Sequence, residues 1–90
     1  MHAAVLTVTI DPEQADDAEI ALRNEIVPMV SSLPGFVAAY WLEAVEGQAM
    51  VLVVFDTEQQ AHEGAPPVGL SPTAGVTIAD VKLRRVAASA

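Results

Sequence analysis

Cysteine is absent from this sequence of 90 residues. Disulfide bonds, thiolate metal ligands and a cysteine nucleophile are therefore excluded. The two histidines, His2 and His62, stand far apart in the chain, so no close histidine pair for a metal exists. A glycine-rich phosphate cradle and a Gly-x-Ser-x-Gly elbow are missing as well. We expect neither a metal site nor a cofactor.

Basic residues are also scarce, with 4 Lys and Arg against 12 Asp and Glu and a formal net charge of −8 at pH 7. Such a chain is repelled by a phosphate backbone, which excludes most nucleic-acid partners. No apolar run reaches the roughly 18 residues of a membrane span. The first residues lack the basic segment of a secretory signal. We expect no nucleic-acid partner, no membrane partner and a cytoplasmic location.

Two-residue alternation of β-branched and other apolar side chains predicts strands over residues 3–10, 36–43, 49–55 and 76–86. In the last strand, Val76 and Ile78 share one parity whereas Val81 and Leu83 share the other. The buried side must therefore change near Asp80. A β-bulge explains this change, and so does a strand whose second half crosses to a partner sheet.

Apolar residues at three- and four-residue spacing predict a long helix over residues 12–32. Asp11 suits its N-cap, Pro12 suits its first helical position, and Gln14 is expected to complete a capping box. Pro28 lies inside this helix and removes one backbone hydrogen bond. We expect a bend near Asn24.

A shorter second helix is predicted to follow Thr57, its N-cap, and to end at Gly64. The next residues, 64–75, hold three prolines and three glycines and predict a loop. This loop is either a plain connector across the end of the sheet or a lid over a site.

The predicted order β-α-β-β-α-β is typical of an α+β, ferredoxin-like domain, with a four-stranded antiparallel sheet and both helices on one face. Residues 1–90 are too few for two cores, so we expect a single domain. Strands 36–43 and 49–55 carry apolar side chains on both faces. Because the chain's own helices cover only one face, the open face is expected to form a homodimer.

The combination of this order with Pro28, "PGF" at 34–36 and "VVFDTEQQA" at 53–61 resembles the dimeric α+β barrel superfamily, and antibiotic biosynthesis monooxygenase-like proteins in particular. The resemblance implies homodimers whose sheets pack face to face. It also implies a small apolar or phenolic, polyketide-like ligand between sheet and helices. Those members called monooxygenases oxidise phenolic compounds with oxygen and no prosthetic group.

If the chain has the site that this resemblance implies, the candidate site residues are Tyr40, Trp41, Asn24, Arg23 and His62. Tyr40 and Trp41 are neighbours in a strand and must point to opposite faces. Asn24 and Arg23 lie mid-helix, where a solvent-facing role is the alternative. His62 ends the short helix, where interaction with the helix dipole is the alternative to a general base.

Parity with Phe36 and Leu42 favours Tyr40 towards the helices and Trp41 towards the dimer seam. Both aromatic residues could equally serve packing alone. Haem degradation, known among similar proteins, is not expected, because no histidine follows His62 and the only tryptophan is in the second strand.

Two functions remain open at this point. The first is a cofactor-independent monooxygenase acting on a small phenolic molecule. The second is a non-catalytic dimeric barrel that binds a small ligand or serves as an assembly module. A hollow space beside Tyr40 or Trp41 would favour the first function, and a solidly filled interior would favour the second.

Overall fold

The computed structural model describes all 90 residues. Its helices and strands follow the predicted order, with the first helix divided into several segments. These elements are β1 His2–Ile10, η1 Pro12–Gln14, α1 Ala15–Ala21, η2 Leu22–Ile26, α2 Val27–Ser31, β2 Phe36–Trp41, β3 Gln48–Phe55, α3 Glu58–Gly64 and β4 Val76–Arg85.

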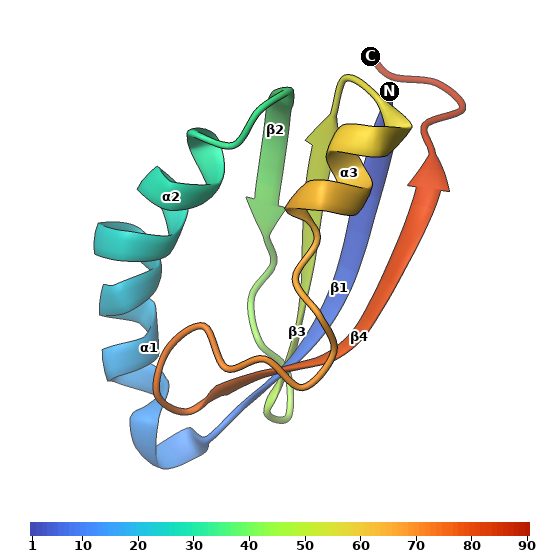
Figure 1. Ribbon diagram of the computed structural model, residues 1–90. Coiled ribbons are helices and arrows are strands. Elements are labelled where there is room, and N and C mark those ends of the chain that lie inside the picture. The colour runs from blue at the N-terminus through green and yellow to red at the C-terminus, as the bar shows by residue number, and fades with distance from the viewer.

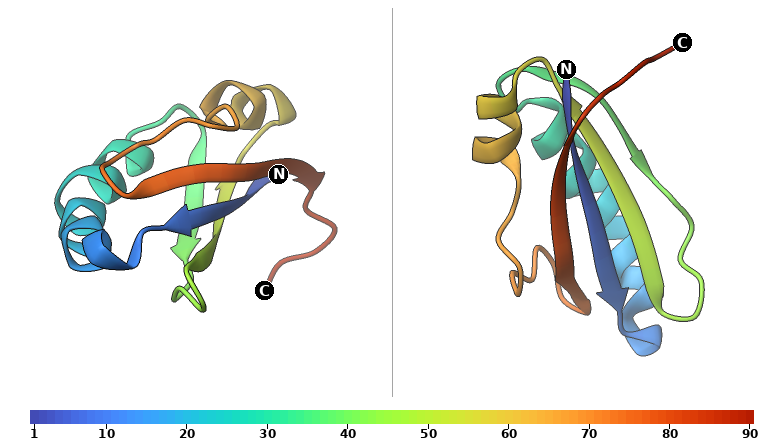
Figure 2. Two further views of the ribbon diagram at one scale, coloured as in Figure 1. Left: turned by 90° about the horizontal axis from the view of Figure 1, so that it is seen from below. Right: turned by 90° about the vertical axis from the view of Figure 1, so that its right-hand side faces the viewer.

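The four strands form one antiparallel sheet in the order β2-β3-β1-β4. This confirms the predicted α+β, ferredoxin-like arrangement with its β-α-β-β-α-β order. In Figure 1, α3 lies over β1 and β3, while the α1 to α2 segment stands beside β2. Figure 2 shows how strongly the sheet twists, so the two helical segments cover different parts of it. No helix has the length and apolar character that crossing a membrane requires.

The core lies on the helix-facing side of this sheet. Alternate residues of β1, namely Ala4, Leu6 and Val8, are buried there, and the facing residues of β3 continue the layer. The full cluster of 11 buried residues comprises Ala4, Leu6, Val8, Ala18, Ala49, Val51, Val53, Phe55, Ala61, Val76 and Ile78. The helices contribute only Ala18 and Ala61 to it, so most of the buried layer is formed by the strands.

The predicted change of parity in β4 is a β-bulge. Thr7 of β1 pairs with Asp80 and Val8 pairs with Ile78, which leaves Ala79 as the extra residue. The bulge keeps both halves of the strand facing the core, since Val76 and Ile78 are buried and Val81 and Leu83 pack against the same cluster. The alternative, a strand that crosses to a partner sheet, is wrong, because β4 pairs with β1 on both sides of the bulge.

At Asn24, where a bend was predicted, the structure has a π-helical segment, η2, between α1 and α2. At its end the Val27 N–H donates to the Leu22 carbonyl, five residues back, in place of the usual four. Pro28 has no N–H to continue the α-helical ladder from Asn24, which accounts for the break at this place.

The predicted caps form in part. Asp11 accepts a hydrogen bond from the Glu13 N–H at 3.0 Å, and Thr57 accepts one from the Gln60 N–H at 3.1 Å. The predicted capping role of Gln14 is wrong, because its side chain makes no cap hydrogen bond and lies against Gly75. The contact with Gly75 joins residues distant in sequence, which local spacing does not reveal.

Gly35, in the turn before β2, gives the first prediction. Its φ of +77° is left-handed, and a Cβ there would overlap the side-chain amide of Gln60, with Nε2 only 2.7 Å away. We expect Gly35→Ala to lower the free energy of unfolding by about 2 kcal/mol, mainly from left-handed strain, with a smaller cost for moving the flexible end of the Gln60 side chain. Urea unfolding followed by Trp41 fluorescence measures this loss.

Gly69→Ala is the matched control for Gly35→Ala. Gly69 also has a positive φ, +92°, but a Cβ there meets nothing within 4 Å. Gly69→Ala is therefore expected to cost only about 1 kcal/mol from backbone strain. Equal losses in the two variants would contradict the contact between Gly35 and Gln60.

Candidate functional site

A cavity of about 800 Å³ lies between the sheet and the helices. This volume falls within the range of about 300–1,000 Å³ that is usual for small-molecule sites. The inner faces of the four strands form its floor, the segment from α1 to α2 forms one wall, and residues after α3 form another. Of the 30 residues that line it, 23 are hydrophobic. The cavity therefore suits a mostly apolar ligand.

The cavity exists because many side chains around it are small. Ala4 and Ala49 in the floor, Ala15 and Ala18 in the helical wall and Ala65 beyond α3 all line it. In a close-packed core, large aliphatic side chains fill the space between a sheet and a helix. The methyl group of an alanine is too short to do so. The predicted alternative of a solidly filled interior is wrong.

The loop after α3 forms a wall of the cavity and is held against β4. The Gly69 N–H donates to the Ile78 carbonyl and the Ile78 N–H to the Leu70 carbonyl, each at 2.8 Å. The Ser71 hydroxyl also donates to the Val76 carbonyl at 2.7 Å. The loop residues that line the cavity are Ala65, Pro66, Leu70, Pro72 and Thr73. The segment is thus a connector and a side of the cavity at once.

Of the two aromatic residues predicted for the site, only Trp41 lines the cavity. Its side chain is half-buried. The predicted orientation of Tyr40 towards the helices is wrong, because Tyr40 lies on the open face and is 59% exposed. The cause is a bulge in β2: Phe36 pairs with Phe55 and Ala38 with the next residue, Val54, which leaves Val37 unpaired. One extra residue reverses the parity of everything that follows it.

Two charged residues of the helical wall line the cavity. Arg23 and Glu19 both line it, and the Arg23 Nη2 lies 3.2 Å from the Glu19 Oε1. Both side chains are mostly exposed, so this ion pair is weak, at about 0.2–1 kcal/mol. Asn24, predicted as a candidate, is exposed and does not line the cavity.

Glu43 is a lining residue that the sequence analysis did not single out. It lies two residues beyond Trp41, in the segment that follows β2. Its carboxylate has neither a hydrogen bond nor an ion pair within the chain. No two-residue alternation marks it, because Leu42 and Ala44 on either side of it line the cavity as well and β2 ends at Trp41.

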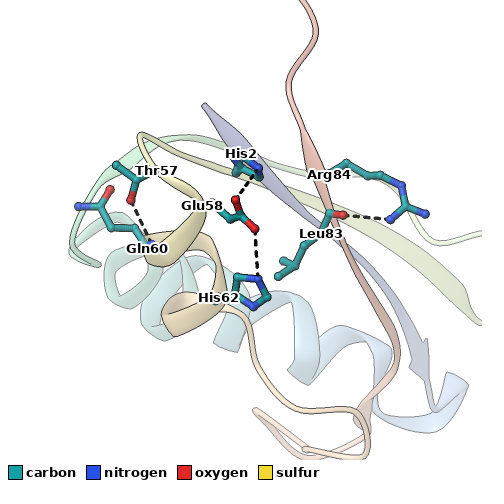
Figure 3. A network of polar contacts seen from close by, with 7 residues as sticks. All are labelled: His2, Thr57, Glu58, Gln60, His62, Leu83 and Arg84. Carbon is teal, nitrogen blue, oxygen red and sulfur yellow. Dashed lines mark hydrogen bonds and ion pairs between the residues drawn. The ribbon is translucent and has the colours of Figure 1, made fainter.

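His62 lies outside the cavity lining and faces another carboxylate. Figure 3 shows His62 and His2 on either side of Glu58, with Nε2 to carboxylate distances of 3.9 and 3.7 Å. The His62 side chain is 63% exposed. No group of three or more histidine or acidic side chains is placed to hold a metal ion. This arrangement links the start of β1 to α3 and is separate from the cavity.

The cavity and fold can be compared with known proteins. The family model described as antibiotic biosynthesis monooxygenase matches residues 1–68, from β1 through α3 to the first part of the loop. A search of curated proteins and a search of solved structures gave no significant match. The family match covers more than half of the chain and agrees with the observed order of strands and helices. The chain therefore belongs to the antibiotic biosynthesis monooxygenase family.

Proposed function

We propose that the cavity binds a small, mostly apolar aromatic molecule and that the protein oxidises it as a cofactor-independent monooxygenase. The observation that carries this proposal is the hollow of about 800 Å³ lined by Trp41 and aliphatic side chains. Membership in the antibiotic biosynthesis monooxygenase family supports the type of reaction.

The proposed reaction needs no electron donor from the protein. When a compound such as anthrone reacts with oxygen, its own CH₂ carbon supplies the electrons. One oxygen atom becomes a carbonyl on that carbon, and the other leaves as water with the two hydrogens. The chain's contribution is an apolar surface that binds and orients the ring.

Binding without oxidation is the second candidate, and one observation favours it. No polar or charged residue is buried anywhere in the chain. The charged residues that line the cavity, Arg23, Glu19 and Glu43, are all exposed. A ligand-binding barrel needs no more than this.

Mixing the protein with anthrone separates these candidates. Native mass spectrometry reports the complex, and an oxygen electrode reports consumption above the rate without protein. Binding together with uptake supports the monooxygenase. Binding without faster uptake leaves the ligand-binding function, and the absence of both contradicts the proposal.

The cavity itself can be tested with two identical substitutions in one helical region. Ile26 lines the cavity, whereas Ile20 does not and is 59% exposed. We expect Ile26→Phe to weaken anthrone binding about tenfold by occupying the space, and Ile20→Phe to leave it unchanged. Trp41 fluorescence, quenched by the bound ring, measures both affinities. Equal affinities would place the ligand elsewhere.

We also propose that residues 1–90 form one domain and that two copies associate through the open face of the sheet. The single domain is supported by β4, which follows the matched region and yet pairs along the whole of β1. The dimer is supported by an apolar area on the open face that includes Tyr40, Met50 and Leu52. Domains of this family typically form dimers.

A further inference from the structure

We propose that the cavity selects apolar aromatic molecules that carry a protonated amine, with Glu43 as the counter-ion. This inference rests on the proposed ligand-binding function and names the chemical class of the ligand. It follows from the charges on the lining of the cavity and from the position of Glu43 in that lining, two residues after Trp41.

The charges on the cavity lining do not balance. Arg23 and Glu19 are paired with each other at 3.2 Å, so together they present no net charge. Glu43 has no partner within the chain. The remaining charge around the cavity is thus one carboxylate, which attracts a cation and repels an anion.

The rest of the molecule acts in the same direction. The chain carries a formal charge of −8, and its other cations, Lys82, Arg84 and Arg85, lie on or at the end of β4 and not in the cavity lining. A field of this sign raises the local concentration of cations and lowers that of anions.

Trp41 adds an attraction that only a cation gains. An indole ring attracts an ammonium group held over its face, and Trp41 lines the cavity two residues before Glu43. A ligand whose rings lie among the aliphatic side chains can therefore place an amine at the edge formed by Trp41 and Glu43. The apolar floor contributes most of the affinity, and Trp41 and Glu43 make the cavity prefer a cationic ligand.

Three probes with one ring system test this inference. They are 9-(hydroxymethyl)anthracene, which is neutral, 9-(aminomethyl)anthracene, which is cationic at pH 7, and anthracene-9-carboxylate, which is anionic. Quenching of the fluorescence of Trp41, the only tryptophan, reports binding of each. We expect the amine to bind about threefold to fivefold more tightly than the neutral probe, and the carboxylate more weakly.

Glu43→Gln should remove the preference for the amine, read as the ratio of the affinities of the amine and the neutral probe for the same variant. Glu46→Gln is the matched control, because Glu46 lies in the same hairpin and does not line the cavity. The preference should also shrink between about 0.01 M and about 0.5 M salt, as it must for an exposed charge pair.

The measurements distinguish a failure of ligand binding from a failure of charge selection. If none of the three probes binds, the ligand-binding function itself is contradicted. If the neutral probe binds but the amine binds no better, or if Glu43→Gln and Glu46→Gln have equal effects, only the charge selection is wrong.

Discussion

Phe55→Ala is expected to lower the free energy of unfolding by about 3–5 kcal/mol, the usual cost of removing a buried aromatic ring. Phe55 is 1% exposed and is the largest fully buried side chain of the protein. A chain this small buries only about 60–65% of its unfolded surface and has little stability to spare. The variant should therefore unfold at a much lower urea concentration than the unmodified protein. Circular dichroism and urea unfolding measure the change.

The contacts of Phe55 explain why no neighbour can replace it. Gly64, at the end of α3, approaches so closely that a Cβ there would lie 2.6 Å from the Phe55 Cζ. The ring thus joins β3 to α3 through a position where only glycine fits. Phe36→Ala is the control, because Phe36 is only half-buried, and its loss should be smaller. A loss for Phe55→Ala below that of Phe36→Ala would contradict this account.

Leu52→Lys is expected to weaken the proposed dimer at least about a hundredfold, because an unpaired ammonium group would be buried between two apolar faces. Leu52 lies on β3 in the middle of the open face, paired with Tyr40 of β2 and Val5 of β1. Sedimentation velocity at micromolar concentration should show twice the 9.4 kDa subunit mass for the unmodified protein and 9.4 kDa for the variant.

Ile20→Lys is the control for this experiment. Ile20 is as exposed as Tyr40, at 59%, but lies on α1, away from the open face of the sheet. The same new charge there should leave the dimer intact. A single 9.4 kDa species for the unmodified protein would overturn the proposed dimer, and dissociation by both variants would place the interface elsewhere.

Local sequence signals predicted most of the fold. Alternation gave all four strands, Asp11 and Thr57 cap helices as their side chains suggest, and Pro28 coincides with the break in the first helix. These features depend on residues close in the chain, so a sequence pattern contains the necessary information. The bulge in β4 could also be predicted, because the apolar residues of this strand change parity near Asp80.

The candidate site was only partly predictable. Trp41 was among the residues named, but the bulge at Val37 placed it in the cavity and Tyr40 outside, the reverse of the expected assignment. No change of parity marked this bulge, because β2 is apolar on both faces. His62 and Asn24 lie away from the cavity, and Glu43 was not singled out.

The sequence by itself determined the order of strands and helices, the acidic charge and the apolar character of both sheet faces. Only the tertiary structure decided that the interior is hollow. The cavity depends on small side chains such as Ala4, Ala18 and Ala65, which three separate elements bring together. Empty volume is a property of how far apart those elements stand, and no local pattern of residues encodes that distance.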